Sequence, residues 1–361
     1  MREEYNNMNE RNYGIDLLRI VSMYGVVILH IISIGGVIEN TEFLSIQHNI
    51  IYCLYVAVIC SVNCYALISG YVGYTGKFKI ENLIGLWLRV VFYSVVGTIV
   101  IALIVAPNNI QPKDIVLSFF PVLNNSYWYF TAYFVVFFFK PILDMGIEKI
   151  DNIILKRILL ILIIAVSSSN IISKDKDIFK LGDGYSALWL IILYILGAYL
   201  RKTNCFENTS KKRLCLGYIV AVAVTAAFGI GAGLVSNKFV GRTIGFNCFN
   251  TYTSPTVVLE AIFLTILFSK IVILNEKHIK IIKKFAASSF SVYLIHIHPF
   301  VKEYLLKDRM VWIANKPVVL NVIIIMGCAL VICGVCYMID FVRSFLVKKI
   351  SKCKTLIKQN D

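Results

Sequence analysis

Apolar runs of about twenty residues recur along this chain and constrain its fold more than any other feature. Each run is long enough to cross the ~30 Å hydrocarbon core of a bilayer as an α-helix. With 58% hydrophobic and only 16% charged residues among 361, the composition excludes a soluble globular protein. We predict an all-α, polytopic integral membrane protein with about ten transmembrane helices in a single membrane-embedded domain over 1–361. The expected spans are 13–37, 50–73, 83–105, 127–146, 153–172, 184–200, 214–235, 254–274, 284–301 and 318–347.

The basic residues are distributed unevenly between the two sides of these spans. Most of the 36 Lys and Arg residues fall in the N-terminal tail, the even-numbered turns and the C-terminal tail, which all face one side. An excess of Lys and Arg marks the cytoplasmic side, so we expect both termini to be cytoplasmic. Anionic lipid headgroups then account for the net charge of +15, and no nucleic-acid partner is expected.

Three ionisable residues, Asp16, Arg19 and His30, lie on one stripe of the first span. Such residues are costly in hydrocarbon and by default mark a functional site. The eleven steps from Arg19 to His30 make about three helical turns, so both side chains share a face and are roughly 16 Å apart along the axis. Asp16 precedes Arg19 by one turn and can pair with it, either within a site or as a structural ion pair.

The expected topology places the other intramembrane polar residues by height. Glu260 and His296 fall in the outer halves of their spans, at a depth similar to that of His30, whereas Arg89 and Asp340 lie near the inner surface. Glu260 and His296 are therefore candidates for acid–base work beside His30, although each could equally be an interhelical hydrogen-bond partner. For His298, which is next to a proline, we favour the structural interpretation.

Four short motifs, in order along the chain, carry a resemblance to a known family. They are Gly14-Ile-Asp-Leu-Leu-Arg19 with His30, Ser69-Gly-Tyr71, Tyr127-Trp128-Tyr129 with Tyr133, and Ser289-Phe-Ser-Val-Tyr-Leu-Ile-His296. The chain resembles the acyltransferase 3 family, membrane proteins that O-acetylate bacterial surface polysaccharides. The resemblance implies a ten-helix fold with cytoplasmic termini in a bacterial cell membrane. It also implies an acyl-coenzyme A donor on the cytoplasmic side, a saccharide hydroxyl as acceptor, and a central role for His30.

On that resemblance, a division of labour among the candidate residues is expected. The phosphates of coenzyme A need cations, which Arg19, Arg89, Lys77 and Lys79 would supply, with Asp16 paired to Arg19. Relatives often carry two arginines near the third span, where this chain has only Arg89. His30 would act as general base on the acceptor hydroxyl, with Glu260 or His296 orienting it or serving the leaving group. The aromatic residues Tyr127, Trp128 and Tyr133 would stack on the acceptor sugar, although an interfacial belt is the simpler interpretation of this cluster. No metal is expected.

The sequence leaves several alternatives open. Intramembrane His, Glu and Asp also build the proton relays of secondary transporters and exporters, but the repeat symmetry usual in those proteins is missing here. A regulatory or sensory membrane domain is a further alternative. The acyl group could be acetyl or succinyl, the acceptor a polysaccharide or a lipid-linked saccharide, and transfer direct or through an acyl-histidine. Homodimerisation and the membrane face that receives the acceptor are equally open.

Overall fold

The structure, a computed structural model, describes residues 11–74, 76–172, 177–240 and 249–357, and every regular element in these ranges is helical. The all-α prediction is therefore confirmed for this part of the chain. The long helices are α2 (Tyr13–Ile32), α3 (Ile46–Ile59), α4 (Ser61–Gly73), α5 (Ile80–Ile104), α7 (Trp128–Lys149), α8 (Asn152–Ile172), α9 (Ala187–Thr203), α10 (Lys211–Val240), α11 (Pro255–Ser269), α12 (Glu276–His296) and α14 (Val318–Ile357). Shorter helices are η1 (Ile38–Asn40), α6 (Pro112–Ser118), η2 (Gly182–Gly184), α13 (Pro299–Val301), η3 (Lys302–Leu306) and η4 (Val311–Asn315).

Seven helical stretches of the described chain are long and apolar enough to cross a membrane. They are Tyr13–Ile32, Ile46–Gly73, Ile80–Ile104, Trp128–Lys149, Asn152–Ser169, Lys211–Phe239 and Val318–Ile350. The helices α3 and α4 together form the second of these stretches. This number of spanning-length helices is that of a multi-pass membrane protein.

The other three expected spans also contain helices, but these are shorter or more polar. Helix α9 has 17 residues and α11 has 15, which at 1.5 Å per residue reach about 25 and 23 Å, less than the ~30 Å hydrocarbon core. The first half of α12 carries several exposed lysines, and only its second half is apolar. The count of ten crossings and the cytoplasmic placement of both termini therefore stay predictions.

Two helix ends differ from the expected bounds because of local capping. Helix α2 ends at Ile32 rather than at 37, since the Ser33 hydroxyl bonds back to the last turn and Gly36 adopts a φ of 79°. Helix α12 begins at Glu276 rather than at 284, because the side chain of Asn275 accepts hydrogen bonds from two N–H groups of its first turn. The sequence pattern tracks apolar residues, whereas these ends are set by polar caps.

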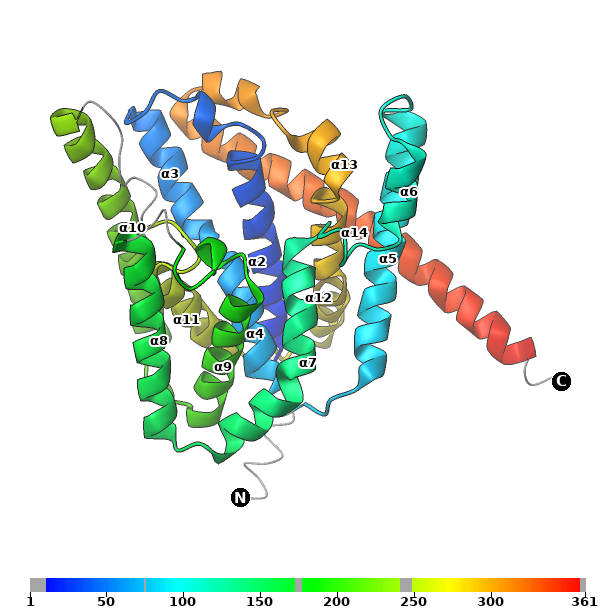
Figure 1. The fold of residues 1–361 in the computed structure, drawn as a ribbon, viewed down its shortest axis with the longest axis horizontal. Helices are drawn as coiled ribbons and strands as arrows, with labels where there is room; N and C mark the ends of the chain where they lie inside the picture. Colours follow the sequence, from blue (N-terminus) through cyan, green and yellow to red (C-terminus); the bar gives the residue numbers. More distant parts are fainter. Residues whose placement is uncertain (1–10, 75, 173–176, 241–248, 358–361) are drawn as a thin grey trace.

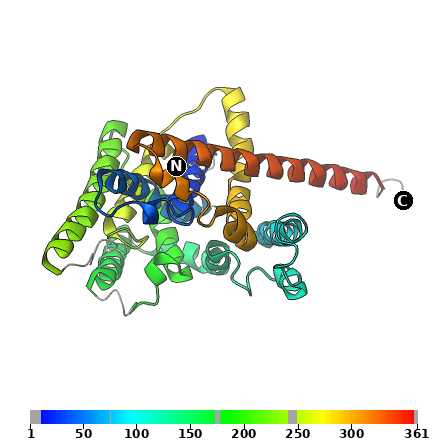
Figure 2. The same cartoon turned by 90° about the horizontal axis from the view of Figure 1, so that it is seen from above.

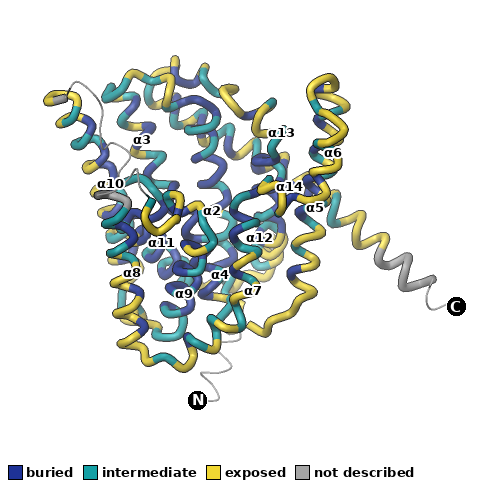
Figure 3. The backbone as a smooth tube through the Cα atoms, viewed as in Figure 1, coloured by how far each residue is buried: buried dark blue, intermediate teal, exposed yellow. Residues whose placement is uncertain are grey.

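Helix α2 occupies the centre of the bundle and is packed against α3, α4, α11, α12 and α14 (Figure 1). In the most apolar part of α2, 67% of residues are buried, against 22% in α8 and in α14, which lie at the periphery (Figure 3). The outward faces of the peripheral helices are nevertheless apolar, as expected of surfaces that contact lipid. Helix α14 extends well beyond the rest of the bundle (Figure 2).

Two glycines allow α4 and α9 to approach backbone to backbone. A Cβ atom on Gly70 of α4 would lie 1.9 Å from the carbonyl oxygen of Tyr194, and one on Gly197 of α9 would lie 2.1 Å from that of Leu67. Small residues commonly permit such close contact between membrane helices. This contact fixes the position of α4, which contributes side chains to the central cavity described below.

Candidate active site

Two histidines from distant parts of the sequence meet near the ends of α2 and α12. His30 lies in the last turn of α2, and His296 is the last residue of α12. Nδ1 of His30 and Nε2 of His296 are 2.9 Å apart, and the ring centroids are 5.2 Å apart. His296 is buried, with 4% of its surface exposed, while His30 is only half-buried. Of the site residues expected from the sequence, these two are therefore brought into direct contact.

The hydrogen bonds of His296 decide which nitrogen of His30 carries a proton. Nδ1 of His296 lies 2.6 Å from the carbonyl oxygen of Val292, so this nitrogen must be the donor. In the neutral ring Nε2 of His296 is then an acceptor, and Nδ1–H of His30 donates to it. Nε2 of His30 is then unprotonated and keeps its lone pair, with no hydrogen bond to it from the described residues. This is the tautomer that a general base requires.

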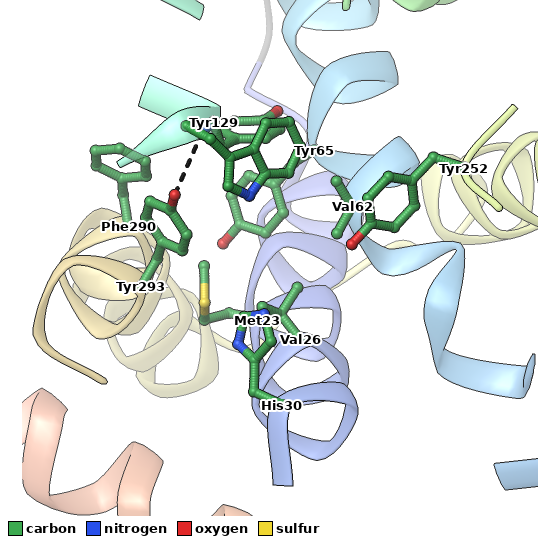
Figure 4. Close-up of a pocket in the computed structure, with 10 residues that line it drawn as sticks. Met23, Val26, His30, Val62, Tyr65, Tyr129, Tyr252, Phe290 and Tyr293 are labelled. Carbon is green, nitrogen blue, oxygen red and sulfur yellow. Dashed lines mark hydrogen bonds between the residues drawn. The ribbon is translucent and has the colours of Figure 1, made fainter. Parts of the chain in front are cut away.

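His30 lines a small cavity at the centre of the bundle (Figure 4). Met23, Val26 and His30 form its wall on α2, at positions separated by three and four residues. These residues continue the stripe that begins at Arg19, so the predicted stripe faces a cavity. The remaining lining residues are mostly aromatic: Val62, Tyr65, Trp128, Tyr129, Tyr252, Phe290 and Tyr293.

Two of the tyrosines that line this cavity differ in how their hydroxyl groups are bonded. The Tyr293 hydroxyl accepts a long hydrogen bond, 3.4 Å, from the backbone N–H of Tyr129 (Figure 4). This N–H lies in the first turn of α7 and has no partner within the helix. The Tyr129 hydroxyl is buried and has no hydrogen-bond partner among the described residues. A buried polar atom left without a partner is costly, and a water, an ion or a ligand group can satisfy it.

At the N-terminal end of the α2 stripe, Asp16 forms ion pairs with two arginines. Its carboxylate, 2% exposed, accepts hydrogen bonds from Arg11 Nε at 2.6 Å and from Arg19 Nη1 at 2.9 Å. The expected pairing of Asp16 with Arg19 is therefore present. The Tyr65 hydroxyl donates to the carbonyl oxygen of Arg19, and Tyr133 interacts with both Ser69 and Arg19. The cavity-lining Tyr65 thus connects the level of Arg19 to the cavity.

The other expected cations lie apart from Arg19. Arg89 is half-buried on α5, donates to the carbonyl oxygen of Ala287 at 3.1 Å and lies near Arg343 and Asp340. Lys77 and Lys79 are exposed in the turn between α4 and α5. Within the described residues, the structure gives none of these three cations a hydrogen bond or ion pair with the Asp16–Arg19 pair.

Glu260 is not brought to the histidine pair. It is fully buried on α11, where Oε1 accepts a hydrogen bond from Thr225 at 3.1 Å, and it does not line the His30 cavity. Nε2 of His298 bonds the carbonyl oxygen of Ser94 at 2.9 Å. The structural interpretation of His298 therefore matches its contacts.

The three expected aromatic residues occupy different positions. Trp128 lines the His30 cavity, Tyr133 lies beside Arg19, and Tyr127 packs on Tyr293 and His298 without lining the cavity. Tyr127 is only 1% exposed, so the interfacial-belt interpretation is wrong for this residue. It is wrong because α7 begins inside the bundle, against α12, rather than at a lipid-facing rim.

Comparison of the sequence with models of known protein families identifies the family of this chain. A family model described as an acyltransferase domain matches residues 12–338. This chain belongs to the acyltransferase 3 family. No curated protein and no solved structure matches it. The motifs of this membrane acyltransferase, spread over nearly the whole sequence, converge on the His30 cavity and on the Arg19 end of its stripe.

Several cavity residues of this acyltransferase were missed at the sequence level. Tyr65 and Tyr252 are single tyrosines in apolar or loop sequence, and no periodicity or motif distinguishes them from other tyrosines of the chain. Tyr293 could have been predicted from the helical period, since it lies one turn before His296 and therefore on nearly the same face of the helix. Only the packing of α4 and of the loop before α11 brings Tyr65 and Tyr252 to α2.

Proposed function

We propose that this acyltransferase transfers an acyl group, acetyl in the simplest case, from acyl-coenzyme A to a hydroxyl group of a cell-envelope polysaccharide or its lipid-linked precursor. The proposed location is a bacterial cell membrane. The observation that carries this proposal is the His30–His296 pair, which leaves Nε2 of His30 unprotonated at the wall of an aromatic cavity. A hydroxyl acceptor needs such a base, because it is a poor nucleophile until its proton is removed.

The donor is proposed to approach from the Arg19 end of the cavity. The side chain of Arg19 is 30% exposed, so it can meet a phosphate while it keeps its contact with Asp16. Lys77 and Lys79 are exposed in the turn after α4 and would add positive charge for the same phosphates. Arg89, which donates to the backbone carbonyl of Ala287, is proposed as a further phosphate ligand.

In the proposed reaction, Nε2 of His30 takes the proton of the acceptor hydroxyl while the oxygen attacks the thioester carbonyl carbon. The new ester bond forms, the carbon–sulfur bond breaks, and His30 returns the proton to the departing thiolate. His296 accepts the hydrogen bond from Nδ1 of His30 and stabilises the imidazolium that forms between the two proton transfers. The Tyr129 hydroxyl is proposed to donate to the oxyanion that develops on the carbonyl oxygen.

The test is transfer by the purified protein in lipid nanodiscs. Radiolabelled acetyl-coenzyme A and cell-envelope polysaccharide are incubated with the wild-type chain and with His30→Ala, and label in the polysaccharide and free thiol are both measured. We expect both signals from the wild type and neither from the variant. Full transfer by a correctly inserted His30→Ala protein would contradict the assignment of the base.

A further inference from the structure

An apolar groove lies between α5 and α14, on the side of the bundle where α14 extends outward (Figure 2). Both helices pack on α12, but their backbones hardly approach each other. The end of α12, α13 and η3 contribute the remaining lining residues. Nearly all lining side chains are aliphatic or aromatic, and many of those on α5 and α14 are exposed. In a membrane this groove therefore opens to the hydrocarbon of the lipids.

The groove matches the hydrocarbon chain of a lipid in length and shape. On α5 it extends from Phe92 to Ile101, a distance of about 14 Å at 1.5 Å per residue. One leaflet supplies half of the ~30 Å hydrocarbon core, which is nearly the same length. On α14 a single stripe of residues, spaced three or four apart, faces the groove: Val331, Val335, Ile339, Val342 and Leu346.

The stripe on α14 ends in positive charge. Lys349 lies eighteen residues, or five full turns, after Val331, so it continues the same face of the helix. It is exposed and has no ion pair with any residue that the structure describes. Arg343 also lines the groove, but Asp340, at 2.8 Å, balances its charge. Lys349 is therefore the cation of this stripe that is available to an anionic group.

The groove also reaches the histidine pair of the candidate active site. His296 and His298 both line it. His296 bonds His30 through Nε2 but does not line the His30 cavity, so its ring lies between the groove and His30. Gly97 of α5 admits the His298 ring, because a Cβ atom there would lie 2.6 Å from it. The occupant of the groove therefore determines whether water reaches this side of His296.

We propose that the groove binds one anionic glycerophospholipid of the bilayer, with an acyl chain between α5 and α14 and its headgroup phosphate at Lys349. In the predicted topology this end of α14 is cytoplasmic, and the cytoplasmic leaflet is rich in anionic lipids. The bound chain keeps water from the groove side of His296. A second copy of this protein suits the groove less well. Copies share one orientation in the membrane, so a two-fold contact would bring their basic ends together.

The test is native mass spectrometry of the purified full-length chain in detergent, titrated with dioleoyl phosphatidylglycerol or dioleoyl phosphatidylcholine. We expect one phosphatidylglycerol to be retained at a clearly lower concentration than phosphatidylcholine. Lys349→Gln should weaken retention of phosphatidylglycerol about fivefold, the effect of one Lys beside an anionic surface, and leave phosphatidylcholine unchanged. Val335→Trp should abolish the tight binding, because the indole fills the groove. Val335 is 54% exposed, so the fold is expected to tolerate the change.

Each variant has a matched control on α14. Lys348→Gln removes a neighbouring exposed charge that points about 100° away from the stripe, and Leu330→Trp adds an indole at an exposed position outside the groove. Both should retain lipid as the parent does. Val100→Trp fills the groove from α5 and serves as a second test if Val335→Trp fails to fold.

Three results would overturn the proposal: equal retention of the two lipids, unchanged retention in a folded groove-filling variant, or a lipid-free dimer that Val335→Trp dissociates. The assay measures lipid binding without donor or acceptor, so its outcome is independent of the proposed acyl transfer.

Discussion

Replacing His296 by leucine tests the central feature of the site without removing the base itself. The variant leaves Nδ1–H of His30 without the acceptor that now lies 2.9 Å away, and it also removes the contact that selects the tautomer. An unpaired buried donor costs about 1–3 kcal/mol, and if this cost falls on the reacting state the rate drops roughly 5- to 150-fold. We therefore expect kcat to fall by about one to two orders of magnitude.

The effect should appear in kcat and leave the KM for acyl-coenzyme A nearly unchanged, because His296 lies far from the proposed phosphate ligands. Thiol release from acetyl-coenzyme A in nanodiscs, at varied donor concentration, measures both constants. His296→Gln should recover part of the loss, since its amide oxygen can accept from Nδ1–H of His30. His298→Leu is the matched control: it removes a histidine that bonds Ser94, so it should lower Tm while sparing kcat of the folded protein. Wild-type kcat in His296→Leu, or a change confined to KM, would refute the reasoning.

Four other changes have defined outcomes. Arg19→Ala should raise the KM for acyl-coenzyme A with little change in kcat, with Arg19→Lys intermediate and Lys77→Ala mild; an unchanged KM in Arg19→Ala would exclude it from donor binding. Tyr129→Phe should lower kcat by about tenfold or more while Tm stays the same or rises, because the hydroxyl has no partner among the described residues; a lower Tm at normal kcat would show a structural role. Gly70→Val should abolish folding, detected as aggregation in size-exclusion chromatography, whereas Gly146→Ala, where a Cβ meets nothing within 4 Å, should behave as wild type. A fluorescent-protein fusion at the C-terminus should fluoresce if that terminus is cytoplasmic, and a dark fusion on an inserted protein would contradict the charge-based topology.

The position of the catalytic candidates along α2 could be predicted because a helix has a fixed period. Arg19 and His30 had to share a face once the run was helical, and the structure places Met23 and Val26 between them on the cavity wall. The contact with His296 was expected only as a similarity of depth. A depth comparison cannot distinguish His296, which bonds His30, from Glu260, which is buried on another helix with Thr225.

The environment of the aromatic residues could not be predicted from the sequence either. Apolar and aromatic patterns cannot tell a residue facing lipid from one facing the bundle interior, since both environments are apolar. Tyr127 is therefore buried where an interfacial position was the simpler expectation. Its environment depends on α7 beginning against α12, and no local feature of residues 127–133 encodes that contact.

The sequence by itself determined the helical membrane fold, the family and the stripe from Arg19 to His30, because hydrophobic length and helical period act locally along the chain. Only the tertiary structure decided the partner of His30, the proton on its Nδ1 and the burial of the Tyr129 hydroxyl away from any partner among the described residues. Each of these depends on side chains from segments far apart in sequence, held in place by contacts such as that of Gly70 with the backbone of Tyr194. Such contacts follow from how the helices pack, which hydrophobic pattern alone leaves undetermined.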